Sequence, residues 1–196
     1  MPVDREAAAR AIRDFLLALG FDPDQHEDLA ETPQRVTEAF ADDLLKGHAV
    51  DIEELLRKGS CEAQSGAKGG PVAVTEIAVA TVCPHHLLPA LGVAHVVYLP
   101  GATLLGIGTI TALVEAFARR LTLQEAIGQN VVSALMQHAG ARGAYCELVL
   151  EHSCLRARGE RQASAVVRSS ARAGEFAGRD AVTEIALALG RAPGAP

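Results

Sequence analysis

Apolar positions recur at helical spacing through the first fifty residues. In residues 4–19 they lie three or four apart, as on one face of a helix, and Gly20 follows as a natural stop. A second helix is predicted over residues 32–47, with Thr32 as a candidate N-cap and Pro33 in the first turn. The chain therefore begins with two helices.

A small, polar stretch then interrupts the pattern. Residues 59–70 are rich in Gly and Ser and are typical of a flexible loop. We therefore divide the chain into an N-terminal helical region, residues 1–58, this loop, a main domain over residues 71–190, and a short tail, residues 191–196.

The main domain alternates pairs of strands with pairs of helices. Residues 71–82 and 91–101 are rich in β-branched side chains and are bounded by Pro or Gly, which predicts strands. Residues 109–140 have helical periodicity with a break near Leu121, and residues 144–170 return to alternation as two strands or one long bent strand. The order αα–ββ–αα–ββ predicts an α+β fold, in which an antiparallel sheet carries its helices on one face.

Composition excludes several classes of protein. The 196 residues carry a formal net charge of −6 at pH 7, which argues against a nucleic-acid surface. No apolar run approaches the roughly 20 residues of a membrane helix, and the charged N-terminus does not have the pattern of a signal peptide. We expect a cytoplasmic protein without nucleic-acid or membrane partners. Its four cysteines are too sparse for a disulfide scaffold and are expected to be free thiols or metal ligands.

Potential metal ligands cluster in the stretch TVCPHHLLP, residues 81–89. It places Cys83, His85 and His86 within four positions, which indicates a metal site, although a lone C-x-x-H is common in proteins. The alternative is that the cysteine is a small buried side chain and that the histidines are hydrogen-bonded within the protein.

A third ligand is available in the last predicted strand. Because a strand alternates its faces, a regular strand over residues 146–158 would place His152 and Cys154 on one face, after apolar residues. Cys83, His86 and Cys154 would then form a Cys2His zinc site with its fourth position open, which is the catalytic arrangement. Zinc in such a site acidifies a bound water.

Four motifs together resemble those of the GTP cyclohydrolase I family. They are ETPQRV, CPHH, LTLQE and EHSCLRARG, which occur in the family's order between about Glu31 and Phe176. The resemblance implies the tunnelling fold, an antiparallel four-stranded sheet with two helices on one face, whose subunits join sheet edges into a barrel. It also implies a ring-stacked homodecamer with active sites between subunits. The implied reaction converts GTP and water to formate and dihydroneopterin triphosphate, the first step of folate and pterin synthesis.

The resemblance also implies roles for individual residues. Cys83, His86 and Cys154 would hold zinc, and His85 and His152 would transfer protons. The guanine and the triphosphate would be bound by the remaining residues of the motifs: Glu125 with Gln124 beside it for the guanine, and Arg158 with Arg35 of a neighbouring subunit for the triphosphate.

One segment departs from the family pattern. Where the family usually has IGLSKLARIV, this chain has LGIGTITALV, so that Gly108, Thr109 and Ala112 replace a Ser, a Lys and an Arg. Two alternatives therefore stay open: a purine-ring hydrolase that has another phosphate preference or stops at the formamidopyrimidine, and a non-catalytic structural or regulatory relative. Four arginines are candidates to replace the lost charge: Arg119, Arg120, Arg156 and Arg168.

Overall fold

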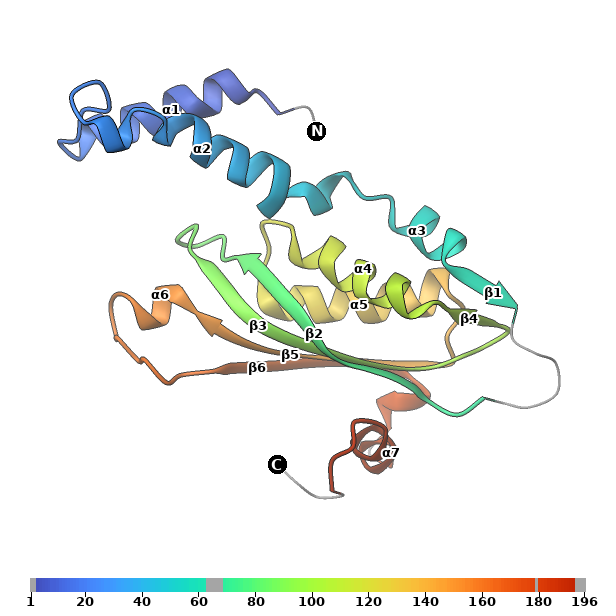
Figure 1. The fold of residues 1–196 in the computed structure, drawn as a ribbon. Helices are drawn as coiled ribbons and strands as arrows, with labels where there is room; N and C mark the ends of the chain where they lie inside the picture. The colour runs from blue at the N-terminus through green and yellow to red at the C-terminus, as the bar shows by residue number, and fades with distance from the viewer. Residues whose placement is uncertain (1–2, 63–68, 179, 193–196) are drawn as a thin grey trace.

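The computed structural model describes residues 3–62, 69–178 and 180–192. Its centre is a four-stranded antiparallel sheet in the order β2-β3-β5-β6 (Figure 1). The strands are β2 (Val72–Val82), β3 (Pro89–Leu99), β5 (Gly143–His152) and β6 (Val167–Gly174). The predicted antiparallel sheet of an α+β fold is confirmed.

Two helices cover one face of this sheet. α4 (Ile107–Ala118) contacts β2, and α5 (Gln124–His138) contacts β5 and β6. Between them the chain leaves the helical path at residues 119–123, where the sequence predicted a break. The apolar stripes of both helices are buried against the sheet because the strands turn their alternate apolar residues toward them. This core includes Ile110, Leu113, Ile127, Leu135 and Leu148.

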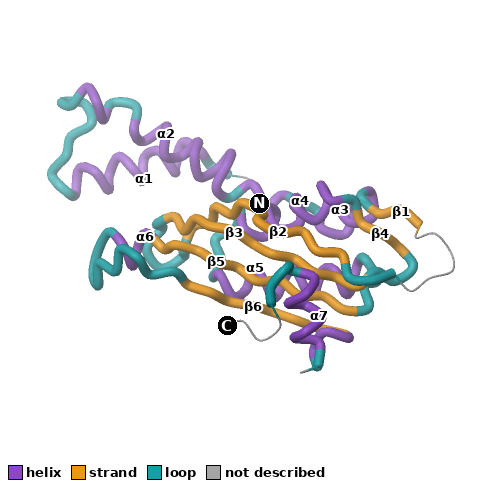
Figure 2. The backbone as a smooth tube through the Cα atoms, turned by 60° about the horizontal axis from the view of Figure 1, so that its bottom comes forward, coloured by secondary structure: helices purple, strands orange, loops and turns teal. Residues whose placement is uncertain are grey.

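The second face of the sheet is partly covered by the C-terminal segment. Here the chain passes through a 3-10 turn, Glu175–Ala177, and forms α7 (Ala181–Ala188), which crosses in front of the strands in Figure 2. Phe176 and Ile185 are buried there against Val97 and Leu99 of β3. The sheet is therefore buried on both faces at this end.

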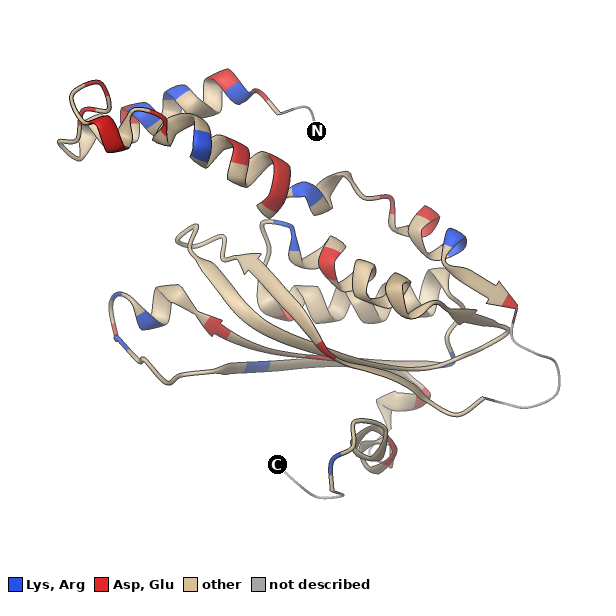
Figure 3. Cartoon of the chain, in the orientation of Figure 1, with Lys and Arg blue, Asp and Glu red and all other residues tan. Residues whose placement is uncertain are grey.

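Helices and turns make up the N-terminal region, which extends beyond the sheet (Figure 1). They are α1 (Arg5–Ala18), a turn at Glu27–Leu29, α2 (Thr32–Glu38), a π-helical continuation (Ala39–Leu44), a 3-10 turn (Lys46–Ala49) and α3 (Ile52–Lys58). Charged residues gather on this arm, whereas the strands carry few (Figure 3). Among the described residues, α1 has no buried side chain, and its Phe15 and the C-cap residue Leu19 are exposed.

Some elements differ from the sequence prediction. The predicted loop at residues 59–70 begins with β1 (Ser60–Glu62), which pairs with β4 (Thr103–Leu105). Residues 63–68 of that loop lie outside the described part, as do residues 193–196 of the predicted tail. β3 begins two residues before the predicted strand. Within the described ranges, no helix has the length and apolar character needed to cross a bilayer.

Candidate functional site

The turn between β2 and β3 brings Cys83 and His86 together. The Cys83 amide donates to the Leu88 carbonyl at 3.0 Å, and the Leu87 amide donates to the Cys83 carbonyl at 2.9 Å. Leu87 has a φ of 54°, a left-handed conformation that is uncommon for a non-glycine residue and often occurs at functional sites. These two bonds close the turn, so the CPHH segment has a defined shape.

Cys154 reaches the same place by a different path from the one predicted. The expected regular strand over residues 146–158 is wrong: β5 ends at His152, and a short helix, α6 (Ser153–Arg156), follows. Residues 153–158 lack β-branched side chains and contain Leu, Arg and Ala, which favour helix over strand. α6 packs against β3 and β5, so its single turn carries Cys154 back to the end of the sheet.

Three potential ligand atoms converge at this end of the sheet. One atom each from Cys83, His86 and Cys154 lie within 4.8 Å of one another. Around a tetrahedral zinc the corresponding separations are about 3.5–3.8 Å, as follows from bond lengths of 2.0–2.3 Å. A small inward movement would therefore close the group around one ion. Because two thiols and an imidazole are the donors that zinc prefers, the residues fit the metal that the resemblance implies.

Arg158 approaches this group from the chain after α6. Its Nη1 donates to Nε2 of His86 at 2.9 Å. Because a guanidinium can only donate, that imidazole nitrogen carries no hydrogen and its one lone pair faces Arg158, so Arg158 would have to move aside for this nitrogen to bind a metal ion. Cys146 is not part of the group: it is buried in the core, and burial raises the pKa of its thiol to about 12.

Gln124 holds His152 in a fixed orientation. Gln124 is only 4% exposed, and its Nε2 donates to the carbonyls of Leu148 at 3.2 Å and Val167 at 3.1 Å. The amide oxygen therefore faces Nε2 of His152 at 2.8 Å. An oxygen there accepts, so Nε2 of His152 carries the hydrogen, and Nδ1 of the neutral ring is left as an acceptor. Burial lowers the pKa of His152, while the carboxylate of Glu125 acts in the opposite direction.

The remaining predicted residues surround this centre unequally. His85 is exposed next to the turn, with its Nδ1 3.8 Å from Sγ of Cys83. Glu125 is exposed in the first turn of α5, close enough to act on the charge of His152. Arg35 belongs instead to α2 in the N-terminal arm, where it forms an ion pair with Glu31. Within one chain, His85 thus lies next to Cys83 and Glu125 near His152, whereas Arg35 lies on the N-terminal arm.

The segment that departs from the family pattern starts α4. Gly108 is exposed, and a Cβ added there would meet nothing within 4 Å. Thr109 turns its hydroxyl toward the Gly59 carbonyl at 3.4 Å, and Ala112 is half-buried. The three positions carry no charge, so the start of α4 offers no cationic side chain to an anion.

The sequence did not predict the hydrogen bonds that Gln124 makes. The resemblance placed it beside a bound guanine, whereas in the structure its amide is buried and bonded to β5, β6 and His152. No sequence signal gives this role, because two of its partners are backbone carbonyls that only the folded sheet brings together.

Comparisons with known proteins agree with the motifs. The sequence profile of a family described as GTP cyclohydrolase I matches residues 8–190. The chain is 37% identical over 187 residues to GTP cyclohydrolase 1 of Leifsonia xyli subsp. xyli, which covers 95% of this chain and 96% of that protein. It is 38% identical to GTP cyclohydrolase 1 of Chromobacterium violaceum, over 89% of this chain and 82% of that protein. GTP cyclohydrolase 1 of Campylobacter lari is 35% identical, over 88% of each chain.

Proposed function

The chain belongs to the GTP cyclohydrolase I family and is a hydrolase of that type, and we propose that it opens the imidazole ring of GTP in a zinc-dependent reaction. The products would be formate and 7,8-dihydroneopterin triphosphate, as in the first step of folate and pterin synthesis. The observation that carries this proposal is the convergence of Cys83, His86 and Cys154 within 4.8 Å, with His85 next to Cys83.

The metal would be held by the two thiolates and the imidazole. Three protein ligands leave one position for water or substrate, and bound zinc supplies the Lewis acidity that makes water a nucleophile near neutral pH. Cys83 is buried and Cys154 half-buried, whereas the neighbouring His85 is exposed, so these residues would hold the ion at the edge of the core. This arrangement supports catalysis over a purely structural role for the ion.

His85 and His152, which lie outside the metal group, would transfer protons. Gln124 fixes the hydrogen of His152 on Nε2, so Nδ1 is the atom that can accept a proton or return one to the purine. His85 is exposed and adjacent to the ligand His86, which places it where a reacting purine could meet it. Gln124 acts here through His152, as a positioning residue.

Glu125 would select guanine. A carboxylate can accept hydrogen bonds from both N1–H and the 2-amino group of guanine, whereas adenine would leave it without these partners. Glu125 is exposed in the first turn of α5 beside His152, so a base bound to it would lie next to the proton-transfer residue. The same contact would align the imidazole ring with the metal group.

Arg158 and Arg35 of a neighbouring subunit would contact the phosphates. Arg35 lies on the N-terminal arm and not at the metal group of its own chain, so it could reach a site only across an interface. A homodecamer with active sites between subunits would supply that interface, and the free edges of β2 and β6 within the described chain are where subunits would pair. The cytoplasmic location expected from the sequence stays a prediction.

A variant of this function has support from the start of α4. Gly108, Thr109 and Ala112 present no charge there, so a preference for a less phosphorylated guanine nucleotide, or a reaction that stops at the formamidopyrimidine, is the second candidate. Both candidates use the same metal group and the same histidines.

Mass spectrometry of the products tests the proposal. Zinc-loaded protein is incubated with GTP, GMP and guanosine, and we expect formate with dihydroneopterin triphosphate from GTP. Release of a formamidopyrimidine alone, or a faster reaction of GMP or guanosine, would favour the second candidate. An intact purine with all three substrates would leave the non-catalytic relative as the correct description.

Metal analysis provides the matched control. We expect one zinc per chain in wild type and in Cys61→Ala, because Cys61 is exposed on β1 and outside the metal group. Cys154→Ala should lose zinc and activity together. Full zinc retention by Cys154→Ala, or a wild type without zinc, would contradict the proposed site.

A further inference from the structure

Two titratable residues are buried side by side on the second face of the sheet, away from α4 and α5. His95 of β3 is 6% exposed, Glu147 of β5 is 7% exposed, and the two are partners in the strand register. Burying a carboxylate is unfavourable unless a cation compensates it. Nη2 of Arg191 donates to Glu147 at 2.6 Å, and Nη1 of Arg168 lies 3.5 Å from its other oxygen.

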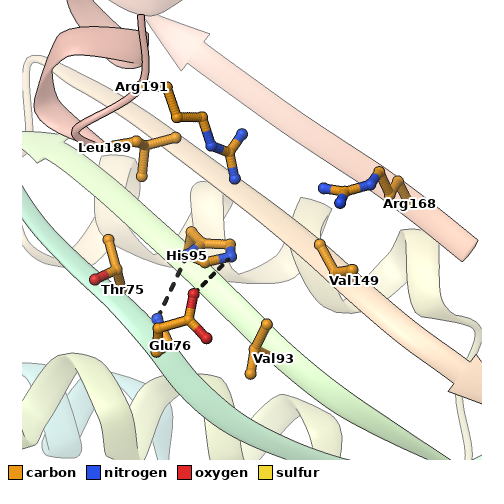
Figure 4. Close-up of a pocket in the computed structure, with 8 residues that line it drawn as sticks. All are labelled: Thr75, Glu76, Val93, His95, Val149, Arg168, Leu189 and Arg191. Atoms are coloured by element: carbon orange, nitrogen blue, oxygen red, sulfur yellow. Dashed lines mark hydrogen bonds and ion pairs between the residues drawn. The ribbon is translucent and has the colours of Figure 1, made fainter. Parts of the chain in front are cut away.

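A cavity of about 280 Å³ adjoins these buried residues, and we call it the reverse-face pocket. Arg168 of β6, Arg191 after α7, His95 and Glu76 form its polar walls, and Val93 and Val149 form part of its apolar floor. Figure 4 shows the guanidinium groups of Arg168 and Arg191 pointing into the same space from two sides. All four strands of the sheet and the C-terminal segment therefore contribute to this pocket.

The two guanidinium groups have donors left for another acceptor. Each carries five N–H groups. Within the described residues, Arg191 forms one hydrogen bond to Glu147, and Arg168 has only its ion pair at 3.5 Å. The Arg168 side chain is 64% exposed, so its remaining donors are accessible to a ligand. A planar anion with two oxygens suits such paired donors because it can accept in a bidentate manner.

A β-bulge shapes the opposite wall. The register of β2 shifts between Val74 and Ile77, and Glu76 within the bulge has a φ of 56°. Its amide donates to Nδ1 of His95 at 3.4 Å, and its carboxylate oxygen lies 3.8 Å from Nε2. Bulges of this kind often turn a side chain toward a functional site. Here the bulge fixes the ring of His95 at the edge of the pocket.

We propose that the reverse-face pocket binds a small monocarboxylate, whose carboxylate lies between Arg168 and Arg191 and whose apolar part rests on Val93 and Val149. The formal charges of Arg168, Arg191, Glu76 and Glu147 sum to zero. One added negative charge is tolerated better than the two of a phosphate dianion. The apolar floor likewise favours an organic acid over an inorganic anion.

Calorimetric titration of the full zinc-loaded chain with butyrate tests this proposal. We expect one butyrate per chain, bound less tightly as the salt concentration rises. Arg168→Gln should weaken binding about tenfold, because it removes a charge-assisted contact. The matched control is Arg172→Gln, which changes an exposed arginine on the same strand that does not line the pocket. It should bind butyrate as wild type does.

Three results would overturn the proposal. They are no heat of binding with butyrate, equal losses in Arg168→Gln and Arg172→Gln, and tighter binding of inorganic phosphate than of butyrate. Since the titration measures binding without turnover, and the pocket holds none of the residues assigned to catalysis, its outcome does not depend on the proposed activity. A zinc measurement on each variant confirms that the metal group at the end of the sheet is unchanged.

Discussion

Replacing Gln124 by methionine tests how the candidate site is supported. The change keeps the length of the side chain and removes both donors and the acceptor. The carbonyls of Leu148 and Val167 then lose a donor, and Nε2–H of His152 loses its acceptor at 2.8 Å. We expect the variant to fold, with lower stability and a less ordered His152.

The magnitude follows from the three contacts. A neutral hydrogen bond contributes about 1 kcal/mol net, and a buried group left without a partner loses somewhat more. Gln124 is 4% exposed, so water does not readily replace the amide at the two carbonyls, whereas His152 is half-buried and can be partly rehydrated. The three losses sum to about 3 kcal/mol. The apolar methionine offsets part of this, so we expect a net decrease of about 2 kcal/mol in the free energy of unfolding.

Urea unfolding followed by circular dichroism measures this decrease. Wild type and variants are compared without metal and at one protein concentration, because bound zinc and assembly both shift apparent stability. Gln129→Met is the matched control, since Gln129 is exposed on the same helix. It should stay within about 0.5 kcal/mol of wild type. A Gln124→Met variant as stable as this control would refute the reasoning.

A nitrogen NMR measurement separates positioning from stability. In wild type the hydrogen of the neutral His152 ring should be on Nε2, and Gln124→Met should lose that preference. Gln124→Glu keeps an acceptor for His152 but loses the amide donors, so it should retain the Nε2–H form while still being destabilised. Loss of this form in Gln124→Glu as well would mean that the amide oxygen does not set the tautomer.

Three further outcomes are expected. The double mutant Thr109→Lys, Ala112→Arg should lower the Michaelis constant for GTP about tenfold more than that for guanosine, and GTP turnover should depend more steeply on salt concentration. A wild type that already binds GTP tightly, together with a double mutant that shows no improvement, would contradict this. Near pH 8, iodoacetamide should label the exposed Cys61 and spare Cys146, because burial raises the pKa of that thiol to about 12; rapid labelling of Cys146 in the native protein would contradict its placement in the core. Light scattering should give a mass near that of ten chains, and a monomer at micromolar concentration would be inconsistent with an interfacial site.

Periodicity was enough to predict the central architecture. The apolar positions of α4 and α5 recur at helical spacing, and the strands are rich in β-branched residues between turn signals, so element types and the antiparallel arrangement follow from local patterns. The break between α4 and α5 was also predicted from the periodicity. Short elements such as β1 and β4 were not predicted, because three-residue strands depend on each other's pairing and not on a pattern of their own.

The site was predictable in composition but not in geometry. The C-x-x-H spacing pointed to Cys83 and His86, yet Cys154 arrives on a helical turn and not on the strand that alternation suggested. The bulge at Glu76 and the burial of Glu147 also had no sequence signal, since both depend on which strands become neighbours. Residue types therefore indicated the chemistry, while strand pairing and one helical turn decided which groups meet.

The arginines that could replace the charges absent from the start of α4 are already engaged. Nη1 of Arg119 lies 3.3 Å from a carboxylate oxygen of Asp43, and its side chain is 19% exposed. Arg120 donates to the carbonyls of Gly47 and Ala116, and its guanidinium lies 4.7 Å from the ring centre of Phe117. Burial lowers the pKa of Arg120. Both residues thus tie the end of α4 to its surroundings instead of facing a ligand.

The other two candidates are no better placed. Arg156 forms an ion pair with Glu151, and Arg168 faces the reverse-face pocket on the opposite side of the sheet from α4 and α5. Within the described part of a single chain, this leaves Arg158 as the guanidinium in contact with the metal group, through His86. One cation balances only part of the charge of a triphosphate. Tight binding of GTP would therefore require Arg35 or another cation from a neighbouring subunit, so dissociation of the assembly should weaken GTP binding more than guanosine binding.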